Sequence, residues 1–159
     1  MAEPAAGTST STLLERYAGG TAAVLDAIEA VGSARLDEAD GEGWTARQVV
    51  HHLADSETRA YLRLRQLLAE DTPHIAAYDE AEYARRLHYD RPIDAAVAVI
   101  RAVRGASLEL LGSLSPADFD RAGSHPEHER YTVSTWLEIY ADHPRDHAEQ
   151  MLRAAGLTA

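Results

Sequence analysis

Two histidines four residues apart, His143 and His147, are the residues of this chain best placed to do chemistry. They lie in a segment with helical periodicity, so both imidazoles project from one face, about 6 Å apart along the helix axis. Two imidazoles at that spacing can bind the same divalent cation. Trp136, Tyr140 and Met151 continue the same stripe, which predicts that the pair faces the interior of the fold.

A cation site of this kind needs a third ligand from another segment, and the pair His51 and His52 is the comparable candidate. This pair also lies in a segment with helical periodicity. His52 falls beside Val49 and Leu53 on the apolar face, whereas His51 points about 100° away from it. The pattern therefore favours His52 as the inward histidine and makes His51 a solvated neighbour.

Three neutral imidazoles around one cation would leave coordination positions open for water or a substrate, which is typical of catalytic sites. Nitrogen ligands suit Zn, Ni, Fe or Co, and the sequence does not distinguish these metals. The cation would lower the pKa of a bound water or thiol and polarise an electrophile. Because ligation requires neutral imidazoles, we expect metal binding to weaken as the pH falls through about 6.5.

Other polar residues near these histidines have two interpretations each. Asp55 follows His52 by one helical turn and is a candidate general base or partner of that imidazole, with a solvated carboxylate as the equal alternative. Tyr140 and Gln150 flank the stripe and could orient an imidazole or a substrate, although core packing is the main expectation for Tyr140. The remaining histidines are expected on the surface or in loops, and the tryptophans in the core: His74, His88, His125 and His128; Trp44 and Trp136.

The composition restricts the classes of function. The chain has 159 residues, 45% hydrophobic and 26% charged, which suits a single globular domain. A formal net charge of −11, without a cluster of Lys or Arg, disfavours nucleic acid and anionic membranes as partners. The chain has no cysteine, which excludes disulfides and a cysteine nucleophile and permits a cytoplasmic location. No signal peptide or membrane span is expected, because residues 1–10 are small and polar and no apolar run is long enough.

Hydrophobic periodicity predicts four long helices and no strand. The helices are expected over residues 11–31, 45–70, 92–114 and 132–155, with a short helix over 79–87 inside the long connection 71–91. Thr45 and Gln48 form a capping box that starts the second helix. The sequence thus predicts an all-α protein, with a flexible tail over residues 1–10 and one four-helix bundle over residues 11–159.

The connection 71–91 is long enough to travel the length of a helix. It would let the third helix start parallel to the second, which gives an up-down-down-up bundle with a long crossover. The second and fourth helices are then antiparallel. Because His52 lies seven residues into the second helix and His147 eight residues before the end of the fourth, both sit at the same level of the bundle.

Three motifs resemble the DinB-like (DinB/YfiT) superfamily over nearly the whole chain: Trp44-Thr-x-x-Gln-Val-Val-x-His52-Leu-Ala-Asp-Ser-Glu57, His125-Pro-Glu, and His143-x-x-x-His147-x-x-Gln-Met151. The resemblance implies the same bundle topology and a divalent metal bound by His52, His143 and His147. Several members that these motifs resemble are S-transferases that use low-molecular-weight thiols such as bacillithiol or mycothiol. Others are isomerases or have no known activity, and homodimers are common.

Two functional hypotheses follow. The first is a metal-dependent enzyme of the thiol S-transferase or hydrolase type, which activates a low-molecular-weight thiol or water toward a small-molecule substrate. Since the chain has no cysteine, any thiol nucleophile would come from a cofactor or substrate. The second is a non-catalytic metal-binding or interaction bundle, in which the metal ties the second helix to the fourth.

Two local features bear on the geometry. Pro144, between the two histidines, removes the N–H that would bond to the Tyr140 carbonyl and can kink the helix. Gly19 and Gly20 weaken the first helix and predict a bend or a close helix contact there. Small residues beside them could form a homodimer interface or pack inside the monomer: Ala18, Thr21, Ala22 and Ala23.

Overall fold

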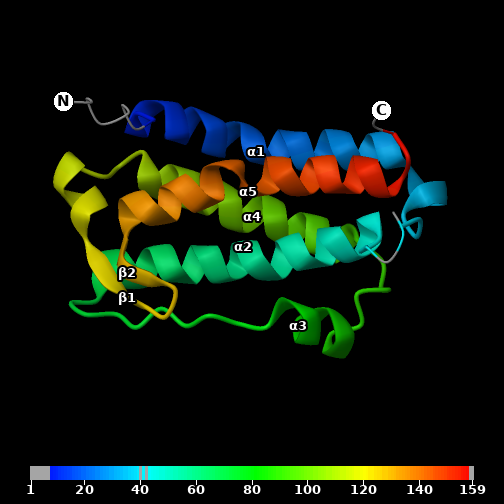
Figure 1. Ribbon diagram of the computed structural model, residues 1–159. Helices are drawn as coiled ribbons and strands as arrows, with labels where there is room; N and C mark the ends of the chain where they lie inside the picture. Colours follow the sequence, from blue (N-terminus) through cyan, green and yellow to red (C-terminus); the bar gives the residue numbers. More distant parts are fainter. Residues whose placement is uncertain (1–7, 40, 42, 158–159) are drawn as a thin grey trace, which may run out of the picture.

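Four long helices form the body of the molecule in the computed structural model, which describes residues 8–39, 41 and 43–157 (Figure 1). Their bounds are α1 Thr10–Val31, α2 Ala46–Ala69, α4 Asp94–Leu111 and α5 Val133–Ala154. In Figure 1, α1 and α5 run in one direction and α2 and α4 in the other, so α2 is antiparallel to α5. The predicted four-helix bundle is confirmed, and most of the tail expected over residues 1–10 lies outside the described residues.

Polar residues cap the N-termini of three of these helices. The predicted capping box of α2 is present, because the Thr45 side chain accepts from the Gln48 backbone N–H and the Gln48 side chain accepts from that of Thr45. The side chains of Ser9 and Thr132 accept the corresponding bonds at α1 and α5. These caps accept hydrogen bonds from backbone N–H groups that a helix N-terminus otherwise leaves unpaired. They therefore determine where each helix begins, close to the starts that the sequence predicts.

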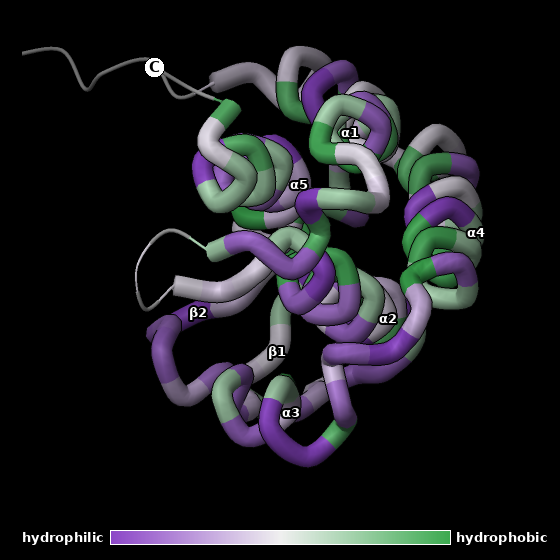
Figure 2. The backbone as a smooth tube through the Cα atoms, turned by 90° about the vertical axis from the view of Figure 1, so that its right-hand side faces the viewer, coloured by the Kyte–Doolittle hydropathy of each residue, from purple (hydrophilic) through white to green (hydrophobic). Residues whose placement is uncertain are grey.

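The connection between α2 and α4 runs along the outside of the bundle and carries the short helix α3 Glu80–Arg86 (Figure 1). Asp79 caps this helix, which agrees with the short helix predicted over 79–87. Viewed along the bundle, the α3 region is mostly hydrophilic and lies on one side of α2 (Figure 2). Ile75 and Tyr89 are the apolar anchors of this crossover, since both are buried against the bundle.

A short β-hairpin lies between α4 and α5, so the prediction that the chain has no strand was wrong. β1 Ala122–His125 pairs antiparallel with β2 His128–Thr132. The strands are polar and half-exposed, so they lack the alternating apolar pattern that reveals a strand in sequence. The crossover holds them instead, because Ile75 N–H donates to the Ser124 carbonyl at 2.8 Å and Ser124 N–H donates to the Pro73 carbonyl at 2.9 Å.

The two remaining elements are short 3-10 turns in the connections that flank the bundle. The first, η1 Ser33–Arg35, lies in the connection between α1 and α2. The second, η2 Pro116–Asp120, precedes the hairpin and begins with Ser115 as its N-cap and Pro116 in its first turn.

The apolar core has two parts, and buried polar side chains lie between them. One part includes Val24, Val31, Val49, Leu53, Ile100 and Met151. The other includes Tyr17, Leu64, Leu67, Leu111, Trp136 and Leu137. Along α2, α4 and α5 the positions between the two parts carry Glu57, Arg104 and His143. The bundle therefore has a polar layer at mid-height.

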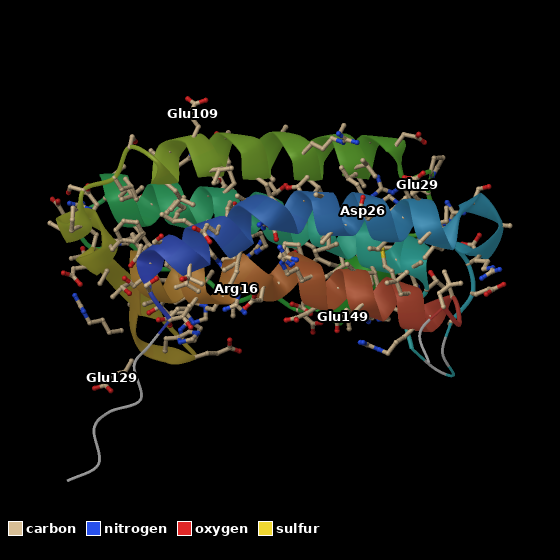
Figure 3. The ribbon with its side chains drawn as sticks, turned by 90° about the horizontal axis from the view of Figure 1, so that it is seen from above. Arg16, Asp26, Glu29, Glu109, Glu129 and Glu149 are labelled. Carbon is tan, nitrogen blue, oxygen red and sulfur yellow. The ribbon has the colours of Figure 1, made fainter. Side chains whose placement is uncertain are left out.

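The outer faces of the helices carry much of the negative charge. Figure 3 labels several of these carboxylates, among them Asp26, Glu109 and Glu149. No helix in the described part of the chain combines the length and apolar character needed to cross a membrane. On α1, Gly20 is buried, whereas Ala22 is exposed. A homodimer through the exposed small residues of α1 stays a prediction.

Candidate metal centre

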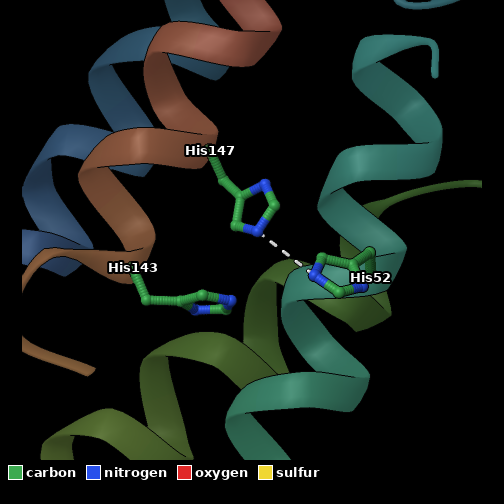
Figure 4. Close-up of side chains that lie close together, drawn as sticks. All are labelled: His52, His143 and His147. Carbon is green, nitrogen blue, oxygen red and sulfur yellow. Dashed lines mark hydrogen bonds between the residues drawn. The ribbon is translucent and has the colours of Figure 1, made fainter. Parts of the chain in front are cut away.

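Three imidazoles from two helices meet in the polar layer (Figure 4). His52 comes from α2, and His143 and His147 come from α5. The Nε2 atoms of His52 and His147 are 3.2 Å apart, and one ring nitrogen from each of the three residues lies within 4.8 Å of the others. The three predicted candidate ligands therefore converge. On α2 it is His52, and not His51, that points toward α5, as the helical phase predicts.

This spacing fits a shared divalent cation. Two nitrogens bound to one tetrahedral cation at about 2.0–2.1 Å are about 3.3 Å apart. The 3.2 Å between the Nε2 atoms of His52 and His147 is close to that value. Three protein nitrogens are also one fewer than a closed structural site requires. The residues present thus fit a cation with open coordination positions.

His143 is oriented by a buried ion pair behind it. Its Nδ1–H donates to Glu57 Oε1 at 3.1 Å, which leaves Nε2 free to bind a metal. Glu57 in turn accepts from Arg104 Nη1 at 2.8 Å, and both of these side chains are only 1% exposed. A carboxylate in this position fixes the ring orientation and makes the imidazole a stronger ligand.

The other two imidazoles are held differently. His147 Nδ1–H donates to the side-chain oxygen of Gln150 at 2.7 Å, one of the roles considered for Gln150 from sequence. The ring of His52 packs edge-on against Trp44, which is half-buried and lies beside the site. In the described part of the chain, Nδ1 of His52 has no hydrogen-bond partner. His52 is therefore positioned by packing and by its contact with His147, whereas the α5 histidines also bond to Glu57 and Gln150.

Burial keeps the two best-buried candidate ligands neutral. Desolvation, followed by the neighbouring imidazoles, lowers the pKa of His52 to about 3. Desolvation and His143 lower the pKa of His147 to about 4, against a smaller raising effect of the bond to Gln150. Neutral imidazoles are the form that binds a metal, so these two ligands are ready for binding well below neutral pH. The sequence-based expectation of weaker binding near pH 6.5 ignored this burial.

Pro144 does not interrupt α5, which is helical from Val133 to Ala154. The Tyr140 carbonyl, which loses its helical donor to Pro144, accepts from Arg104 Nη1 at 3.4 Å. The proline ring itself packs against α1, where a Cβ at Gly20 would lie 3.0 Å from it and 2.8 Å from an Arg104 nitrogen. The close helix contact predicted at Gly19 and Gly20 is thus present at Gly20, where it makes room for Pro144 and Arg104.

Asp55, the candidate general base, is not among the residues that converge with the three histidines. Its Oδ2 accepts from the Tyr89 hydroxyl at 2.6 Å, on the side of α2 that faces the crossover. His51 lies on the same side and is only 3% exposed, so the prediction that it is solvated was wrong. It stacks on Tyr89 and its Nε2 bonds to the Arg91 carbonyl at 3.0 Å. The crossover, whose position the sequence did not reveal, covers it.

The other candidate residues are distributed as follows. Tyr140 is buried and its hydroxyl accepts from Arg63, so core packing is its main role. Trp136 is fully buried, and its indole donates to the Ala60 carbonyl. His74 and His88 are exposed. His125 and His128 are outside the converging set but pack against Tyr131 and line a cavity that His143 also lines.

Sequence reasoning missed Glu57 and Arg104. Glu57 lies five residues after His52 in the motif, but its role depends on a cation that is 47 residues away on α4. The sequence offered one signal, an arginine among the apolar positions of α4. A charge is rarely buried without a partner, so this arginine indicated a buried carboxylate elsewhere.

Comparison with known proteins adds the following. A family model described as the DinB superfamily matches residues 4–151. A protein of Oceanobacillus iheyensis, provisionally named a metal-dependent hydrolase, is 42% identical over 105 residues, and a relative from Bacillus mycoides with the same provisional name is 34% identical over 105 residues. Each match covers 66% of this chain and 61% of the relative, so the chain spans less than two thirds of these relatives.

The structure is also similar to that of YfiT from Bacillus subtilis, described as a probable metal-dependent hydrolase with an unusual four-helix bundle topology. The TM-score is 0.85 at 28% identity, and the match covers 98% of this chain and 92% of the other.

Proposed function

The chain belongs to the DinB superfamily, and from this membership and its three converging histidines we propose that it is a metal-dependent hydrolase of a small-molecule substrate. The observation that carries the proposal is the geometry of His52, His143 and His147, whose ring nitrogens lie within 4.8 Å of one another. A divalent cation held there, Zn, Ni, Fe or Co, would supply a water of lowered pKa and polarise the bond to be cleaved.

The surrounding residues keep the ligands in their binding form. Glu57 and Gln150 accept the Nδ1–H groups of His143 and His147, so both rings present Nε2 to the same point. Arg104 fixes Glu57 through its Nη1 and donates to the Tyr17 carbonyl of α1 through Nη2 at 2.7 Å. His143 on α5 is therefore connected through Glu57 to α2, through Arg104 to α4, and through the Tyr17 carbonyl to α1. These connections limit the movement of its ring during a reaction.

The side chain of His143 is 20% exposed and lines a cavity, so a substrate can reach this side of the site. That access supports a catalytic role over the alternative of a non-catalytic bundle in which a metal only ties α2 to α5. The names of the relatives favour water over a thiol as the nucleophile. Thiol S-transfer, implied by the DinB-like resemblance, is the second candidate, with the thiol supplied from outside the cysteine-free chain.

The test combines metal analysis with two parallel screens of the full chain. The protein, loaded in turn with each of the four metals, is assayed on small esters and amides in water, and on electrophiles with bacillithiol, mycothiol or glutathione. We expect ester or amide hydrolysis that His143→Ala abolishes and His74→Ala leaves unchanged. Turnover only in the presence of a thiol would replace hydrolysis by S-transfer. Stoichiometric metal without turnover in either screen would favour the non-catalytic bundle.

A further inference from the structure

A small cavity of about 190 Å³ opens beside the candidate metal centre. Its walls come from α2, the crossover, the hairpin and α5, and they include His143. At about 30 Å³ per water molecule, the space would hold about six waters, which suits a short arm of a small molecule. The hairpin closes one side with Tyr131, which is 1% exposed.

Arg63 is the one arginine or lysine among the residues that line this cavity. Its guanidinium donates to two neutral oxygens, the Tyr140 hydroxyl at 3.0 Å and the Ala76 carbonyl at 2.6 Å. In the described part of this acidic chain, no carboxylate forms an ion pair with it. A half-buried guanidinium with five N–H donors and no anionic partner has capacity to bind one.

Two tyrosine hydroxyls add to this donor-rich surface. Tyr78 and Tyr131 line the cavity, and within the described residues their buried hydroxyls have no hydrogen-bond partner. Burial raises the pKa of both phenols, so both stay protonated and can donate. Buried hydroxyls are normally paired, and an acceptor in the cavity would pair them.

We propose that this cavity binds a carboxylate group of the substrate, with Arg63 as the residue that selects it. The inference rests on the proposed hydrolase function, since it places the carboxylate next to His143 and the bond to be cleaved at the metal. Glu80 and Glu127 also line the cavity, but both are exposed, so solvent screens their charge. The substrate class is thus a small ester or amide with a free carboxylate on a short arm.

The experiment is a calorimetric titration of the metal-loaded full chain with acetate, succinate and glutarate, each paired with its uncharged amide. We expect at least one carboxylate to bind more tightly than its amide. Arg63→Gln should weaken that binding by roughly ten- to a hundredfold, Arg63→Lys by less, and Tyr131→Phe severalfold. Arg65→Gln is the matched control, because Arg65 lies two residues along α2, is also half-buried and bonds to Ser107 of α4.

The outcomes separate the two proposals. Binding is measured without turnover, so absence of hydrolysis would contradict the function and leave the carboxylate site standing. Arg63→Gln that binds as tightly as the wild type, or no preference for any carboxylate over its amide, would overturn the site. Carboxylate binding that survives Arg63→Gln but is lost in His52→Ala would assign the anion to the metal instead. Metal content and far-UV circular dichroism check that each variant is folded.

Discussion

The two sides of α2 show how adjacent residues of one helix serve different purposes. On the side facing α5, His52 meets two other imidazoles, and its Nδ1 has no hydrogen-bond partner in the described part of the chain. On the side facing the crossover, His51 stacks on Tyr89 and bonds to the Arg91 carbonyl. Both histidines are buried, so burial alone does not distinguish a ligand from a structural residue.

The difference lies in what each polar group has as its partner. On the crossover side, His51 and Asp55 are satisfied by protein groups and need nothing further. On the α5 side, ring nitrogens of three imidazoles lie within 4.8 Å of one another, and the hydrogen bond between His52 Nε2 and His147 Nε2 at 3.2 Å has the spacing that a shared cation would need. Several imidazoles whose ring nitrogens converge on one point therefore indicate a binding site, whereas a histidine held by backbone and aromatic contacts indicates a structural role.

The largest expected effect separates the two adjacent histidines. His52→Ala should abolish stoichiometric metal binding, as should His143→Ala or His147→Ala, because two imidazoles alone hold a divalent cation weakly. His51→Ala is the matched control and should retain about one metal per chain. Metal analysis of the purified variants decides. Retention by His52→Ala together with loss by His51→Ala would reverse the assignment of the two sides.

The next effect concerns the buried ion pair behind His143. Arg104→Met leaves Glu57 buried without its cation, so it should lower the free energy of unfolding by about 3–5 kcal/mol. Arg101→Met, on the exposed side of α4, should change it by less than about 0.5 kcal/mol. Urea unfolding at constant metal load measures both.

A double variant tests whether the pair acts as a unit. Glu57→Gln combined with Arg104→Met should be more stable than Arg104→Met alone, because no unpaired charge stays buried. Glu57→Gln should also weaken metal binding by roughly ten- to a hundredfold through His143. Additive losses in the double variant would contradict the coupling between Glu57 and Arg104.

The pH dependence follows from the lowered pKa values of His52 and His147. Their pKa values of about 3 and about 4 mean that protons do not displace a metal from these two nitrogens between pH 8 and pH 5. We therefore expect His52 and His147 to stay neutral, and so able to bind a metal, until the pH approaches about 4, provided that the chain stays folded. An NMR titration of the metal-free protein measures this, and a midpoint near pH 6.5 for either imidazole in the folded chain would contradict their burial.

The stability of the metal-free protein should respond over a different range. An unfolded histidine titrates near 6.5, so between about pH 6.5 and pH 3–4 the unfolded chain binds more protons than the folded one at His52 and His147. The contribution of His52 and His147 to the free energy of unfolding is therefore fully present above pH 6.5. It is lost as the pH falls from 6.5 toward 3. Urea unfolding of chelator-treated protein across this range measures it.

The candidate ligand set was accessible from sequence because its convergence depends on local rules. Helical spacing placed His143 and His147 on one face, and a capping box fixed where α2 begins and thus which way His52 points. What the sequence did not reveal depends on contacts between distant segments. Arg104 finds Glu57 across the bundle, and Gly123 lets the hairpin approach the crossover, where a Cβ would lie 2.5 Å from the Pro73 carbonyl.

The smallest expected effect tests Asp55 on the crossover side. Tyr89→Phe removes the hydroxyl that donates to Asp55, and Asp55→Asn removes the charge, so each should cost about 1–3 kcal/mol of unfolding free energy. The folded fraction of each variant should keep its metal and any hydrolytic turnover. The reason is that Asp55 lies apart from the converging nitrogens. The comparison of the two variants is informative because both weaken the same hydrogen bond, but only Asp55→Asn removes the carboxylate. If Asp55→Asn stopped turnover in metal-loaded protein while Tyr89→Phe did not, Asp55 would be a general base, and the crossover side of α2 would share in the chemistry.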